Sequence, residues 1–214
     1  MARPLSDDEI QDFRASLCEV AERLFAEQGY EGVTLRAIAA ELGCSPMTPY
    51  RYFENKEAIF TAVRTAAFMR FGQAIQAATR AHPDPVDRLG ALARAYIRFA
   101  MAQPQAYRIM FEMAREAGID AELLAQPEKR EAILCGWQPL VTALVELHEA
   151  GHVEGDPLTQ AHLAWSALHG LVTLELSRKL LLGREFDDLV EPLIEFFLRG
   201  IGAPPASVES GASP

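Results

Sequence analysis

The sequence is poor in cysteine and has no long apolar run. Its three cysteines, Cys18, Cys44 and Cys135, lie far apart without a CxxC pair, so we expect neither a disulfide framework nor a zinc site. No stretch approaches the roughly 20 consecutive apolar residues that a membrane-spanning helix needs. Acidic residues stand at positions 7–9, where a secretory signal would be basic and then apolar. These absences predict a cytoplasmic protein with buried or incidental thiols, and a redox role for Cys44 is the alternative.

Positive charge is also scarce. The chain has 20 basic residues against 30 acidic ones and a formal net charge of −10. Affinity for nucleic acid comes largely from Lys and Arg, so composition alone does not indicate a DNA-binding protein. The shortage is uneven, because residues 34–56 hold three basic residues against two acidic ones. A DNA site there would also need hydroxyls, backbone N–H groups and helix N-termini as phosphate ligands.

Motifs of catalysis and cofactor binding are missing as well. The sequence contains no GxSxG, no Walker-type loop, no HExxH and no dinucleotide fingerprint. The C-terminal half contains His148, His152, His162 and His169, but no carboxylate or thiol pattern fixes a ligand geometry around them. We therefore expect no enzymatic activity, no cofactor and no metal site.

What is present is hydrophobic residues at helical spacing. They recur with this period along almost the whole chain, and no run alternates long enough to predict a sheet, so the fold class is all-α. The first helix is expected over about 7–28, with Gly29 as its C-terminal cap. Further helix starts are expected near Thr34, Ser45, Asn55, Asp84, Pro104, Pro127, Asp156 and Asp187 or Asp188, with a loop around Gly118.

Residues 34–52 have the pattern of two short helices joined by a tight turn. Thr34 can cap the first helix, Gly43 can end it, and Ser45 can cap a second helix that starts at Pro46 and runs to about Tyr52. A helix of about two turns held in this way can place its N-terminal half in the roughly 12 Å wide major groove of DNA.

The segment TLRAIAAELGCSPMTPYRYFENKEAIF, preceded by LFAEQGYEGV, resembles the DNA-binding domain of the tetracycline-repressor (TetR) family. The match covers roughly residues 10–62. The shorter segment AWSALHGLVTLEL is similar to a C-terminal subgroup of this family marked by Trp, His and Gly, here Trp165, His169 and Gly170. The resemblance implies an N-terminal three-helix helix-turn-helix DNA-binding domain at 1–54 and a larger helical ligand-binding and dimerisation domain at 55–201. Composition adds a disordered tail at 202–214.

The resemblance also assigns roles to individual residues of the DNA-binding domain. It implies that Thr48 and Met47 lie nearest the base edges, and that Tyr50 and Tyr52 contact phosphates. The alternatives are that the two tyrosine rings pack between helices and that Lys56 is a solvated side chain. Met47 and Pro49 depart from the family pattern, so base preference does not follow by analogy. The implied DNA-facing set is Thr34, Arg36, Ser45, Pro46, Met47, Thr48, Tyr50, Arg51, Tyr52 and Lys56.

The C-terminal helices are expected to hold an effector pocket and a dimer interface. Candidate pocket residues are aromatic or Met side chains that equally suit a helical core, together with His169: Phe68, Phe71, Tyr96, Met101, Tyr107, Met110, Phe111, Trp137, Trp165 and His169. Within the family the last two helices pair with those of a second subunit, which implies interface positions Leu168, Val172, Leu176, Val190, Leu193, Ile194 and Phe197.

These features together predict a DNA-binding transcriptional regulator, most often a repressor in this family. It would bind a palindromic double-stranded operator as a homodimer and be released by a largely apolar small-molecule effector. The alternative is a helical adaptor that binds only proteins. That class explains the acidity and the apolar C-terminal helices, but not the spacing of hydroxyl and basic groups from Thr34 to Lys56.

Overall fold

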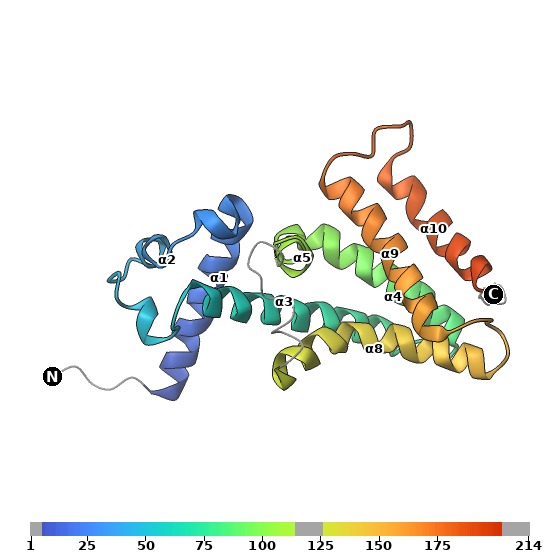
Figure 1. Cartoon of the computed structure of the whole chain (residues 1–214), viewed down its shortest axis with the longest axis horizontal. Coiled ribbons are helices and arrows are strands. Elements are labelled where there is room, and N and C mark those ends of the chain that lie inside the picture. The colour runs from blue at the N-terminus through green and yellow to red at the C-terminus, as the bar shows by residue number, and fades with distance from the viewer. Residues whose placement is uncertain (1–5, 114–125, 203–214) are drawn as a thin grey trace, which may run out of the picture. The chain divides into compact units, whose positions relative to one another are not determined.

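The computed structural model describes residues 6–113 and 126–202, and within these ranges all regular structure is helical (Figure 1). The expected all-α fold is confirmed, while the expected loop around Gly118 and the tail from residue 203 lie outside the described residues. The elements are α1 (Asp7–Gly32), α2 (Leu35–Glu41), the 3₁₀ turn η1 (Pro49–Arg51), α3 (Lys56–Thr79), α4 (Pro85–Ala102), α5 (Pro104–Phe111), α8 (Pro127–Glu149), α9 (Pro157–Leu176) and α10 (Phe186–Gly200).

Side-chain caps determine where several helices begin. At each cap a side-chain oxygen accepts a hydrogen bond from a backbone N–H group of the first turn, which the helix itself cannot satisfy. The capping residues are Ser6 for α1, Thr34 for α2, Asn55 for α3, Asp84 for α4 and Asp156 for α9. All but Ser6 are start signals expected from the sequence, and the structure confirms them.

The chain divides into two compact units. One comprises Met1–Met69 with Gln103–Ile133, and the other comprises Arg70–Ala102 with Leu134–Pro214. Helix α5 packs with α1 in the first unit, where a guanidinium nitrogen of Arg108 donates a hydrogen bond to the Ala26 carbonyl at 3.3 Å. A segment that follows the predicted domain boundary at residues 54 and 55 thus packs in the same unit as α1 and α2.

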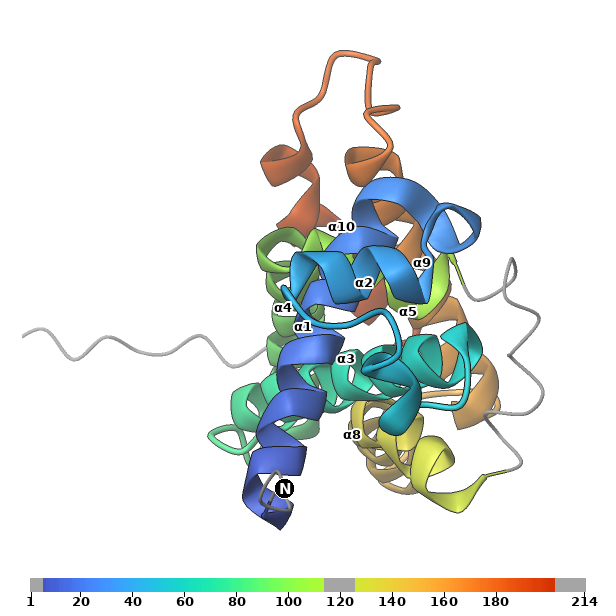
Figure 2. The same ribbon diagram turned by 90° about the vertical axis from the view of Figure 1, so that its left-hand side faces the viewer.

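Aromatic rings fill the centre of the first unit. Phe25 and Phe60 are fully buried and meet edge to face with ring centroids 5.1 Å apart, and Tyr30 lies 5.1 Å from Phe60 in the same manner. Ile38 brings α2 to this core, since it is also fully buried. Figure 2 shows α2 lying across α1. The core therefore fixes α1, α2 and the start of α3 as one rigid support for the turn that follows α2.

Helix α4 is the central helix of the second unit. Most of its residues are buried, and it packs against both α9 and α10. At its surface Arg94 donates two hydrogen bonds to the carboxylate of Glu191 on α10, at 2.7 and 2.6 Å. These hydrogen bonds hold the pKa of Glu191 below its usual value. Helices α9 and α10 lie side by side, joined by the loop at the top of Figure 1.

Helices α3 and α8 approach each other closely at two glycines of the second unit. A Cβ atom on Gly136 would lie 2.5 Å from the ring of Phe71. A Cβ atom on Gly72 would lie 2.5 Å from the Sγ atom of Cys135 and 3.0 Å from its carbonyl carbon. Both positions exclude a side chain because the facing helix already occupies the space.

Gly136→Ala is expected to lower the free energy of unfolding by about 1–3 kcal/mol, the usual cost of overpacking a core. The atoms that face position 136 belong to the Phe71 side chain. Gly136→Ala should therefore lower the free energy of unfolding by less in a Phe71→Leu background. Urea denaturation of the two single variants and the double variant measures this coupling.

The control pair is Gly72→Ala with Cys135→Ala, because the backbone carbonyl of Cys135 keeps its place when the thiol is removed. We expect Gly72→Ala to lower the free energy of unfolding by nearly the same amount with and without Cys135→Ala. An equal cost of Gly136→Ala with and without the Phe71 ring would contradict this packing account.

Candidate nucleic-acid interface

The predicted helix-turn-helix lies between Thr34 and Phe53. The Oγ1 atom of Thr34 accepts a hydrogen bond from the Ala37 N–H group at 3.1 Å and so starts α2. After α2 the chain turns through Gly43, whose φ of 64° lies in the left-handed region that glycine adopts without strain. The N–H group of Cys44 then donates to the Ala39 carbonyl at 3.0 Å and closes the turn. The helix end expected at Gly43 is therefore confirmed.

The second helix of the motif is shorter than expected. An α-helix was predicted over 46–52, but the structure has turns over 46–48 followed by the single 3₁₀ turn η1. Pro49 has no N–H group to donate to the Ser45 carbonyl, which instead accepts a hydrogen bond from the N–H group of Thr48 at 2.8 Å. Hydrogen bonds that span three residues define a 3₁₀ turn, so Pro49 makes this segment tighter than an α-helix.

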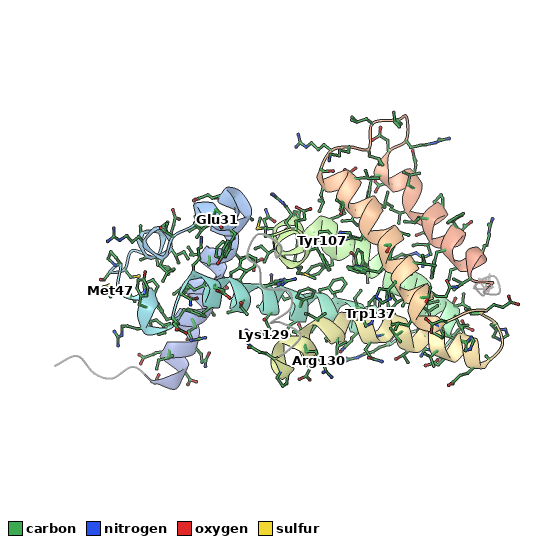
Figure 3. All side chains as sticks on the ribbon, in the orientation of Figure 1. Glu31, Met47, Tyr107, Lys129, Arg130 and Trp137 are labelled. Carbon is green, nitrogen blue, oxygen red and sulfur yellow. The ribbon has the colours of Figure 1, made fainter. Side chains whose placement is uncertain are left out.

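Most side chains that the resemblance assigns to DNA lie on the surface of this motif. Met47 is 67% exposed and Tyr50 is 51% exposed. Figure 3 labels Met47 on this segment. Large apolar and aromatic groups kept in water on one short segment are typical of a surface that a partner covers. The exposed members of the predicted set are Thr34, Arg36, Ser45, Pro46, Met47, Tyr50 and Arg51, and Thr48, Tyr52 and Lys56 are half-buried.

Tyr52 and Phe53 tie the end of the motif to α1. The ring of Tyr52 lies against that of Phe13 with centroids 4.6 Å apart, and its carbonyl accepts a hydrogen bond from Arg14 at 2.6 Å. The guanidinium of Arg14 also lies 4.2 Å from the ring centroid of Phe53, which is buried. The ring of Tyr52 therefore packs between helices while that of Tyr50 is exposed. Contact of either hydroxyl with phosphate stays a prediction.

Lys56 is held by the end of α1. Its Nζ atom donates a hydrogen bond to the Tyr30 carbonyl at 2.9 Å and lies 4.2 Å from the centroid of the Tyr30 ring. The Glu31 carboxylate lies 3.7 Å from the same nitrogen. Burial raises the pKa of the Tyr30 hydroxyl, and the nearby carboxylates raise it further. The ammonium group of Lys56 thus interacts with Tyr30 and Glu31 at the end of α1. Contact of Lys56 with DNA stays a prediction.

Arg23 on α1 and the two arginines of the motif differ in their partners. Arg23 is paired with Glu27 and Glu41, and the Glu41 hydrogen bond raises the pKa of its guanidinium further. By contrast, Arg36 and Arg51 are exposed, and neither side chain has a hydrogen bond or ion pair within residues 6–113 and 126–202. These two are the cations that the motif leaves available to a phosphate backbone.

The thiols are all free and half-buried in the part of the chain that the structure describes. Burial raises the pKa of Cys18 to about 11, which makes this thiol a poor nucleophile at neutral pH. Cys44 directly follows the glycine turn of the motif. Its redox role stays an untested alternative.

The candidate pocket residues in the first unit act together as core. Tyr107 and Met110 are fully buried, and the ring of Phe111 contacts those of Tyr107 at 4.9 Å and Phe68 at 5.7 Å between centroids. These rings fill the space between α3 and α5, where Arg64 also donates a hydrogen bond to the Met110 carbonyl at 3.0 Å. Figure 3 shows Tyr107 on α5 within this unit.

In the second unit the candidate pocket residues form a chain of contacts. The ring of Phe71 meets that of Tyr96 edge to face at 5.4 Å, and the Tyr96 hydroxyl lies 3.4 Å from Nδ1 of His169. From His169 the contacts continue to Trp165 at 5.8 Å and on to Trp137 at 6.2 Å. The last candidate of this unit, Met101, lines a cavity of about 610 Å³ along α4 and α10. Direct ligand contact by any of these residues stays a prediction.

The predicted dimer positions divide by burial. Leu168, Val172 and Ile194 are buried within one chain, whereas Leu176, Val190, Leu193 and Phe197 are half-buried. The exposed apolar residues of the same two helices were not predicted: Leu158, Leu163 and Leu174 on α9, and Phe196 on α10. They stand out only by their exposure, which the hydrophobic spacing of the sequence does not reveal.

Among the described residues, no group of three or more His, Cys, Asp or Glu side chains is arranged to hold a metal ion. No helix within residues 6–113 and 126–202 combines the length and apolarity that crossing a membrane requires.

Known proteins match both ends of the chain. The profile described as "Bacterial regulatory proteins, tetR family" matches residues 17–63, and that described as "Tetracyclin repressor-like, C-terminal domain" matches residues 89–197. The HTH-type transcriptional activator FasR of Mycolicibacterium smegmatis is 23% identical over 163 residues, which are 76% of this chain and 68% of FasR. The uncharacterised HTH-type transcriptional regulator Rv1255c of Mycobacterium tuberculosis is 34% identical over 73 residues, which span 34% of this chain and 36% of that relative.

Solved structures share the fold. A protein of unknown function from Rhodococcus sp. RHA1 has a TM-score of 0.74 and 28% identity, with 88% of this chain and 95% of that one covered. The transcriptional regulator FadR from Bacillus subtilis, solved in complex with stearoyl-CoA, has a TM-score of 0.69 and 18% identity, with coverage of 87% and 98%. At such low identity, the FadR likeness shows the fold alone.

A helix-turn-helix followed by a helical C-terminal region, each matched separately, defines the class of DNA-binding transcriptional regulators. The chain belongs to the TetR family, since the matched regions together cover most of its length. The resemblance drawn from the helix-turn-helix segment is confirmed.

Proposed function

We propose that this protein binds a palindromic operator as a homodimer, represses transcription there, and leaves the DNA when a small-molecule effector binds its C-terminal region. The observation that carries the DNA part is the surface formed by α2 and by the turn and 3₁₀ segment that follow it. It combines the unpaired cations of Arg36 and Arg51 with the exposed side chains of Met47 and Tyr50. On a chain of net charge −10, this surface supplies positive charge where a duplex would meet the motif.

Selection of random duplex DNA by the purified protein tests the proposal. We expect recovery of an inverted repeat, because two identical subunits related by a two-fold axis read two half-sites of opposite orientation. Affinity for the recovered duplex should fall steeply between two salt concentrations, as release of phosphate counterions requires. A folded protein that enriches no sequence would instead favour the adaptor class.

The exposed faces of α9 and α10 support the homodimer. Leu163 and Leu174 are three turns apart on α9, with Gly170 between them, and a Cβ atom on Gly170 would meet no atom within 4 Å. Phe196 on the adjacent α10 is 76% exposed. Apolar side chains that flank a small residue let a helix of a second copy approach closely, and two such helices from each subunit form a four-helix bundle.

Phe196→Glu is expected to convert the dimer to a monomer, because the interface would have to bury an unpaired carboxylate. Light scattering coupled to gel filtration measures the mass, and operator affinity should fall with it. The matched control is Leu158→Glu, since Leu158 is an exposed leucine of α9 away from the face of Leu163 and Leu174. A Phe196→Glu protein that stays dimeric at micromolar concentration would contradict this interface.

The link between effector and DNA is the long helix α3, whose residues contribute to both compact units. An effector shifts the protein toward a non-binding state only by binding that state more tightly than the operator-bound one. The structural likeness to FadR, a regulator solved with stearoyl-CoA, supports a small-molecule effector. We propose that operator binding represses transcription. Because the relative FasR is named an activator, a reporter assay with the recovered operator is the measurement that decides between repression and activation.

A further inference from the structure

The second unit contains a cavity whose lining residues differ from the predicted aromatic ligand residues. It has a volume of about 460 Å³ and lies between the C-terminal end of α3, the start of α4 and the middle of α8. Small-molecule sites commonly have volumes of about 300–1,000 Å³. No Phe, Tyr, Trp or Met side chain is among the described residues that line this cavity.

Basic side chains line this cavity without acidic ones. Arg80, His82 and Arg88 contribute to the wall, and the described lining residues include neither Asp nor Glu. Since the chain as a whole carries a net charge of −10, the cavity is a local reversal of charge. The hydroxyl of Thr142 and the amide of Gln138, both from α8, add neutral hydrogen-bond donors to the same wall.

The two arginines differ in how much of their hydrogen-bonding capacity the protein uses. One guanidinium nitrogen of Arg88 is paired with the carboxylate of Glu146, but its Nε atom is buried and has no hydrogen-bond partner in the described part of the chain. Arg80 is exposed, and its side chain makes no ion pair within residues 6–113 and 126–202. A buried N–H group without an acceptor costs free energy.

We propose that this cavity binds a small anionic molecule that carries a phosphate or carboxylate group. The oxygens of such a group accept hydrogen bonds from both guanidinium groups, which present planar donors suited to them. Glu146 neutralises part of the charge of Arg88, so the unpaired charge of Arg80 supplies most of the attraction. The inference rests on the proposed function, to which it adds the chemical class of the effector.

Calorimetric titration tests the proposal with inorganic phosphate and with citrate, each against chloride at the same ionic strength. We expect saturable binding of one anion per chain, and the stronger of the two probes identifies the preferred group. Arg80→Gln should weaken binding roughly tenfold or more, as loss of a charge-assisted hydrogen bond does. Arg184→Gln is the matched control, because Arg184 is an exposed arginine outside the cavity.

Thiol alkylation locates the bound anion. Cys135 lines the cavity, and its Sγ atom accepts a hydrogen bond from the Gln76 amide at 3.0 Å. Phosphate or citrate should slow the reaction of Cys135 with iodoacetamide, read by mass spectrometry, and leave the rate at Cys44 unchanged. With its pKa of about 11, Cys18 reacts slowly under all conditions.

Absence of saturable binding, or binding that survives Arg80→Gln and leaves the Cys135 rate unchanged, would overturn the proposal. Operator binding is measured separately on the anion-free protein. A failure of DNA binding is therefore distinguishable from a failure of the anion site.

Discussion

Replacing Arg36 and Arg51 together by alanine is expected to weaken operator binding by on the order of 100-fold, because two charge-assisted hydrogen bonds to phosphate are lost. Neither side chain has a partner in the described part of the chain, so no internal contact is lost with them. The free energy of unfolding should therefore change by no more than about 0.5 kcal/mol. Fluorescence anisotropy with the recovered operator measures the affinity.

The salt dependence of the same variant distinguishes phosphate contact from indirect effects. Each neutralised phosphate contributes roughly 0.9 to the slope of log affinity against log salt, so the double variant should lose about 2 from that slope. Arg130→Ala with Arg184→Ala is the matched control, since both are exposed arginines outside the motif. An unchanged slope in the Arg36 and Arg51 variant, or an equal loss of affinity in the control, would disprove the assigned contacts.

Phe60→Ala is expected to lower the free energy of unfolding by about 3–5 kcal/mol, the usual cost of emptying a buried aromatic site. Domains of this kind are stable by only about 5–15 kcal/mol, so the expected loss is a large fraction of the total stability. The ring of Phe60 is fully buried and meets Phe25 and Tyr30 edge to face, so both contacts are lost along with the buried area. Urea denaturation followed by circular dichroism measures the change.

Leu182→Ala provides the comparison, because the side chain of Leu182 is 97% exposed on the loop between α9 and α10. We expect that variant to lie within about 0.5 kcal/mol of the original protein. If Phe60→Ala cost no more than Leu182→Ala, the aromatic centre of the first unit would not be the core that supports the DNA-binding turn.

Helix starts and the helix-turn-helix could be predicted because their signals are local. Thr34 and Asn55 cap the first turns of α2 and α3 through contacts only three residues away, so a short stretch of sequence contains both partners. The predicted length of the second helix of the motif was wrong, for a reason that is also local. Pro46 suits a first helical position, but Pro49 lacks the N–H group that would donate the first α-helical hydrogen bond to the Ser45 carbonyl.

The roles of individual side chains were harder to predict, because several act through distant partners. Tyr52 and Tyr50 are alike in sequence context, yet only Tyr52 has Phe13 and Arg14 beside it. Likewise, Arg23 and Arg51 are both basic residues without an adjacent basic residue, and only Arg23 lies within reach of Glu41. The sequence therefore did not indicate which members of the DNA-facing set lack internal partners, and contact of the set with DNA stays a prediction.

The sequence by itself determined the all-α class, the caps and the family of this protein, because hydrophobic period, capping residues and the helix-turn-helix motif are properties of short segments. Only the tertiary structure decided that α5 packs with α1, that the predicted pocket aromatics contact one another, and that Arg80 and Arg88 share a cavity without acidic residues. These features depend on packing between segments far apart in the chain, such as α4 and α10 joined through Arg94 and Glu191. Residue spacing along the sequence has no information about such pairs, because their proximity is decided by the shapes that fill the core.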